Sequence, residues 1–159
     1  MKSNRMLMTA LVTAALAIGA GHPALAADTH AHAAGAPAEL ALDHGRRWAT
    51  DEPLRRHMGD LHGLLVTRID SIHAGRLSPA DFRALGAAVE QKVAAIVAEC
   101  KLPPDADAML YLIVADLVAG ADLMQGKASG QPADGAHKVV EAANAYGRYF
   151  EHPGWNPLG

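Results

Sequence analysis

The residues best suited to chemistry in this sequence are its nine histidines, six methionines and one cysteine. The densest local group is residues 28–32, which read DTHAH. If export processing cleaves after Ala27, the new amine, two backbone amides and His30 form a square-planar nitrogen set that suits Cu(II) or Ni(II). Cleavage after Ala26 puts His30 fourth and spoils that geometry, which leaves a solvated arm with incidental histidines. The arm is one predicted copper site, with His30 and His32 as ligands.

A second group of soft ligands is predicted at one end of a helical bundle. In four helices of alternating direction, the starts of the first and third meet the ends of the second and fourth. Thioether, thiolate and imidazole groups favour Cu(I). The alternative is that the methionines fill the core and the cysteine acts as a small hydrophobe. The predicted ligands at this end are Met58, His62, Cys100, Met109 and His152.

No catalytic pattern stands out in the sequence. Gly-x-Ser-x-Gly, phosphate-loop, His-Glu-x-x-His and Glu-x-x-His motifs are all absent. Cys100 ends a predicted helix rather than opening one, so no helix N-terminus lowers the pKa of its thiol. We therefore expect a protein that is not an enzyme.

Residues 1–26 have the features of a cleaved signal peptide. Lys2 and Arg5 precede an uncharged apolar run at 6–20, and Ala24-Leu25-Ala26 supplies the small-x-small cleavage pattern. The run is too short for a convincing membrane span. We expect a periplasmic protein with an arm at 27–38, a helical domain at 39–159 and no membrane span after processing.

Charge and cysteine content narrow the partners of the processed chain. Of 14 lysines and arginines two lie in the leader, so 12 basic residues face 17 acidic ones and the net charge is −5. This argues against nucleic acid or anionic lipid as the main partner. A single cysteine cannot form an internal disulfide, so packing must stabilise the domain.

Apolar residues repeat at helical spacing through most of the domain. Ser78-Pro79-Ala80-Asp81 is the clearest helix start, with a capping serine, a proline at the first position and an acid in the first turn. We expect an all-α fold, an antiparallel up-down-up-down four-helix bundle. Trp155 is expected to pack back over one bundle end, near Trp48. The predicted helices cover residues 51–74, 78–100, 105–125 and 132–151, with a short additional helix at 39–48.

Two sequence blocks, GRRWATDEPLR at 45–55 and YFEHPGW at 149–155, carry a family resemblance. They resemble a group of small exported proteobacterial proteins without an established activity, over about residues 40–158. In architecture the chain also looks like the periplasmic four-helix cytochromes, of the c-prime and b types, which is a likeness of fold alone.

The resemblance to the cytochromes implies a haem site that the sequence does not supply. Cytochrome c-prime attaches haem through Cys-x-x-Cys-His, whereas this chain has one cysteine, so covalent haem is excluded. The b-type relative pairs an early methionine with a late histidine. Met58 fits the first role, but the level opposite it falls near Tyr146, while His137 and His152 lie elsewhere. We expect no haem.

Two functions follow as hypotheses. The first is binding of a transition metal, copper preferred, by the arm and by the Met/Cys/His end. The second is a metal-free accessory or scaffold role in which the chain binds another envelope protein through the first long helix, at residues 51–74. A homodimer is also left open.

Overall fold

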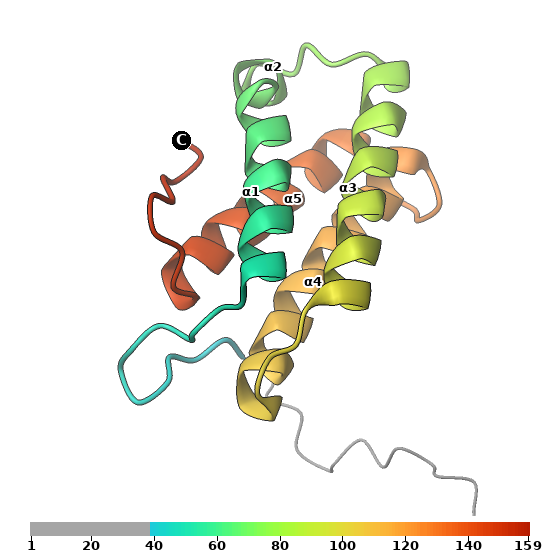
Figure 1. Ribbon diagram of the computed structural model, residues 1–159. Coiled ribbons are helices and arrows are strands. Elements are labelled where there is room, and N and C mark those ends of the chain that lie inside the picture. Colours follow the sequence, from blue (N-terminus) through green and yellow to red (C-terminus); the bar gives the residue numbers. More distant parts are fainter. Residues whose placement is uncertain (1–38) are drawn as a thin grey trace, which may run out of the picture. The chain divides into compact units, whose positions relative to one another are not determined.

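The computed structural model describes residues 39–159, which contain five helices and no named strand (Figure 1). The predicted all-α class is therefore confirmed for this part of the chain. The predicted signal peptide at 1–26 and the arm at 27–38, with His30 and His32, lie outside the described residues. None of the helices described is long and apolar enough to cross a membrane.

The first predicted helix is divided into two. α1 spans Glu52–Val66 and α2 spans Ile69–His73. Asp51 caps α1 by accepting from the Leu54 backbone N–H at 2.9 Å, as expected for an acid before a helix. The prediction of one helix to residue 74 was wrong. The backbone departs from α-helical geometry at Arg68, whose φ is −119° and whose N–H donates to the Leu65 carbonyl, three residues back, at 2.9 Å.

The next three helices begin and end near the expected residues. α3 spans Pro79–Glu99 and starts with the predicted serine cap, and Ser78 forms a reciprocal capping box with Asp81. α4 spans Pro104–Gln125 and ends at Gly126, whose positive φ of 73° is easy for glycine. α5 spans Pro132–Tyr149.

The short helix predicted at residues 39–48 is absent. Asp43 and Arg46 instead pair through two backbone hydrogen bonds of 2.8 Å across a tight turn. His44 and Gly45 occupy the turn with φ of 47° and 85°. A polar residue followed by glycine, both with positive φ, is typical of a two-residue hairpin turn and incompatible with a right-handed helix.

α1 and α3 lie side by side, and α4 packs against both α3 and α5 (Figure 1). Glycines allow the closest approaches. A Cβ at Gly86 of α3 would lie 2.8 Å from the Ala121 carbonyl oxygen of α4, and one at Gly120 would lie 2.6 Å from the Gly135 carbonyl oxygen of α5. The helix backbones therefore touch at these points. The largest side chains fully buried between the helices include Leu54, Met58, Leu61, Leu65, Ile113, Leu117, Tyr146 and Phe150.

Candidate functional site

The two predicted methionine ligands are buried. Met58 has no exposed surface and belongs to the hydrophobic core. Met109 is 7% exposed, and its sulfur accepts a hydrogen bond from the Ala41 backbone N–H at 3.3 Å. Both thioethers thus occupy positions in which methionine fills a core.

Cys100 lies at the C-terminal end of α3 and is half-buried. Burial raises the pKa of its thiol to about 11, and the nearby carboxylates of Asp51, Glu99 and Asp107 act in the same direction. A thiol with so high a pKa is a weak thiolate donor, since a metal must displace its proton. Across residues 39–159, no group of three or more His, Cys, Asp or Glu side chains could hold a metal ion.

Of the five predicted ligands, the structure brings His62 and His152 together, around Trp155. The ring centroid of Trp155 lies 4.7 Å from that of His62 and 5.1 Å from that of His152. His62 Nε2 lies 2.8 Å from the Asn156 carbonyl oxygen, and His152 Nδ1 lies 3.0 Å from the Tyr146 hydroxyl oxygen. Each imidazole therefore already has a protein hydrogen-bond partner.

The pKa of His152 is lowered from its ordinary value, chiefly because burial penalises the charged ring. Arg55 and His62 lower it further through their charges. Burial also raises the pKa of its partner Tyr146. The hydrogen-bonded pair is thus held in its neutral form at neutral pH.

The C-terminal tail packs back onto the helices, as predicted for Trp155. Its indole lies against Gly147 of α5, so close that a Cβ at that position would be 2.2 Å from Nε1. Further along, the Asn144 side chain forms two 2.8 Å hydrogen bonds with the Leu158 backbone, and Leu158 is buried. The tail is thereby fixed to α5 at two places.

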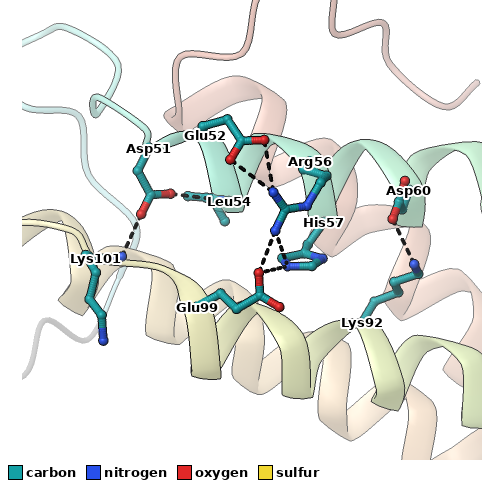
Figure 2. A network of polar contacts seen from close by, with 9 residues as sticks. All are labelled: Asp51, Glu52, Leu54, Arg56, His57, Asp60, Lys92, Glu99 and Lys101. Atoms are coloured by element: carbon teal, nitrogen blue, oxygen red, sulfur yellow. Dashed lines mark hydrogen bonds and ion pairs between the residues drawn. The ribbon is translucent and has the colours of Figure 1, made fainter.

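A polar network joins α1 to α3 (Figure 2). Arg56 forms ion pairs with Glu52 and Glu99, and Glu99 lies 3.1 Å from His57 Nε2. The pKa of Glu99 is lowered mainly by the hydrogen bond from His57. Further along α1, Asp60 pairs with Lys92 of α3 at 2.8 Å. These contacts fix the two helices beside each other.

For His57 the sequence favours a solvated position on the flank of its helix, and this prediction was wrong. Only 8% of the residue is exposed, and its Nδ1 has no hydrogen-bond partner. The sequence does carry the pattern that could have found it. His57 follows Leu54 by three positions and precedes Leu61 by four, so it shares the apolar face of α1.

A shallow groove of about 200 Å³ runs between α3 and α4. Val97 and Tyr111 border it and are 69% and 67% exposed, although large apolar side chains are usually covered. Val118 continues the row of α4 that contains Tyr111 and Val114, since it lies four positions after Val114, and it is 38% exposed. The residues that line the groove are Ile96, Val97, Cys100, Asp107, Leu110, Tyr111 and Val114.

Comparison of the chain with protein-family models, with curated proteins and with solved structures found no match. A functional interpretation therefore depends on the geometry of these sites.

Proposed function

We propose that this chain is a non-enzymatic periplasmic protein, folded as an antiparallel four-helix bundle, that binds another envelope protein in the α3–α4 groove. The observation that supports this most is the concentration of exposed apolar surface at one place. Val97 and Tyr111 stand on opposite sides of the same groove, and Val118 extends the apolar row along α4. Contiguous exposed apolar surface commonly marks an interaction site.

The shape of the groove favours a helix as its occupant. Two packed helices leave a furrow between them that accepts a row of side chains from a third helix. An amphipathic helix presents such a row at positions i, i+3, i+4 and i+7. Apolar residues at these positions would cover Val97, Tyr111 and Val114.

Charge at one end of the groove specifies the occupant further. Asp105 and Asp107 lie in the first turn of α4, are exposed and form no ion pair within residues 39–159. Asp107 also lines the groove. Opposite charges across an interface fix its register and speed association. The partner segment is therefore an amphipathic helix with lysine or arginine at the end that lies beside the first turn of α4.

Site-specific photo-crosslinking in the producing cells tests this proposal. A photoreactive phenylalanine analogue replaces Tyr111, and the matched control carries it at Glu141, an exposed position on α5. We expect the analogue at position 111 to crosslink to an envelope protein. The crosslinked site should lie in an amphipathic helix of that protein, and one end of this helix should carry lysine or arginine. When the analogue at position 111 is combined with D105K and D107K, the yield of the adduct should fall several-fold, because the two new lysines would repel the basic end of the partner helix.

Three results would overturn the proposal: no adduct specific to position 111, an adduct with a second copy of this chain, or equal labelling in the D105K/D107K background. Circular dichroism of each variant separates a folding defect from a lost interaction.

Copper binding is the second candidate function. It is favoured by the DTHAH tract with His30 and His32, which lies outside the described residues. The predicted ligands within residues 39–159 add little support for copper binding, because Met58 is enclosed by the core and the Cys100 thiol has a raised pKa.

A further inference from the structure

A second hollow, of about 240 Å³, lies where the end of α5 meets the C-terminal tail and the segment before α1. Its walls combine two arginines, an indole and a proline. The lining residues are Arg47, Asn144, Gly147, Arg148, Trp155 and Pro157.

The backbone brings the two arginines together. Trp48 donates its N–H to the Tyr149 carbonyl and accepts from the Glu151 N–H, both at 2.8 Å. Arg47 and Arg148 each immediately precede a residue of this pairing, so the two chain segments present them to the same hollow.

Neither arginine has a carboxylate partner within residues 39–159, whereas Arg46, Arg56 and Arg68 each do. No aspartate or glutamate is among the residues that line the hollow. Two unpaired guanidinium groups at one concave site repel each other, and a shared anion relieves that repulsion. The site therefore favours a negatively charged ligand.

The remaining walls indicate what the anion is attached to. Trp155 and Pro157 offer flat apolar surface. The Asn144 amide forms two hydrogen bonds with the Leu158 backbone, one through its oxygen and one through its nitrogen, so its position in the wall is fixed. A guanidinium group matches the two oxygens of a carboxylate.

We propose that this hollow binds a small organic carboxylate with a flat apolar body. Arg47 and Arg148 hold the carboxylate, and the body lies against Trp155 and Pro157. This site is separate from the α3–α4 groove and does not depend on the function proposed above.

Titration of the protein with benzoate at low ionic strength tests the site, with inorganic phosphate as the comparison anion. The readout is the NMR signal of the Trp155 indole N–H, assigned with the W48F variant because the chain has two tryptophans. We expect saturable binding of benzoate that shifts this signal, and weaker binding of phosphate, which cannot use the indole wall. R47Q and R148Q should each weaken benzoate binding by about tenfold or more, as expected for loss of a charged hydrogen bond.

R83Q is the matched control, because Arg83 is an exposed arginine of α3 that does not line the hollow and forms no ion pair within residues 39–159. It should bind benzoate as the unaltered protein does. The proposal fails if benzoate binding does not saturate, if R47Q and R148Q bind like R83Q, or if phosphate binds more tightly than benzoate. Unchanged circular dichroism of R47Q and R148Q confirms that weaker binding reflects the lost guanidinium.

Discussion

The indole of Trp155 lies directly on Gly147. If residue 147 carried a Cβ, that atom would lie only 2.2 Å from Nε1 of the indole. The same Nε1 is buried without a hydrogen-bond partner. An indole N–H normally finds a partner when it is buried, so close packing on Gly147 is obtained at the expense of that bond.

The first prediction concerns this contact. G147A should displace Trp155 and destabilise the protein by about 1–3 kcal/mol, the usual range for overpacking. Urea unfolding followed by tryptophan fluorescence measures the loss. G63A is the matched control, since a Cβ at Gly63 of α1 meets nothing within 4 Å and alanine stabilises a helix interior by about 1 kcal/mol. Equal stabilities for the two variants would contradict the packing described here.

The second prediction concerns pH. Because the pKa of His152 is lowered in the folded protein, the unfolded chain binds more protons just below the ordinary histidine pKa of about 6.5. Stability from this residue is therefore complete above that value and falls as the pH drops toward the folded-state pKa. H152Q should lose less stability than the unaltered protein between about pH 6.5 and pH 5. Identical pH profiles for the two proteins would show that His152 does not contribute.

The third prediction concerns Asp51, whose two carboxylate oxygens have separate tasks. One accepts from the Leu54 N–H at 2.9 Å and caps α1, while the other accepts from the Lys101 N–H at 2.6 Å beyond the end of α3 (Figure 2). D51N keeps one acceptor and loses the other, whereas D51A loses both. Denaturant unfolding should rank D51A below D51N and D51N below the unaltered protein, with D51A about 1–3 kcal/mol less stable. Equal stability of D51N and D51A would contradict separate tasks.

The fourth prediction concerns copper and the arm. If His30 and His32 form the Cu(II) site, an H30A/H32A variant should lose submicromolar Cu(II) binding, whereas C100S should retain it because the Cys100 thiol is protonated at neutral pH. Calorimetric titration of proteins whose amino terminus has been established by mass spectrometry measures both. Retention by H30A/H32A would rule out the arm as the site.

The helices were predictable where the sequence repeats an apolar stripe between recognisable ends. The capping serine Ser78 illustrates this, because a helix cap is a local feature that determines backbone geometry within one turn. The division near Thr67 was missed because the apolar spacing continues through it to Ile72, which is buried in α2. The turn at His44 and Gly45 was missed although the sequence carries its signal. A polar residue followed by glycine favours a turn with positive φ at both positions over a short helix.

The candidate sites were less predictable, since they depend on packing between distant segments. Alternating helix direction led us to expect His62 and His152 at the same end of the molecule, and the rings of both lie against Trp155. The hollow at Arg47 and Arg148 depends on a backbone pairing between residues 101 positions apart or more, which no local pattern encodes.

The touching backbones of Gly120 and Gly135 have a consequence for mutational tolerance. Any side chain at either position would meet the opposite helix within 2.6 Å, so a single substitution cannot be absorbed by a rotamer change and must separate two helix axes. These two sites should accept almost no replacement in a saturation library, while neighbouring exposed positions such as Ala119 and Asp134 vary freely.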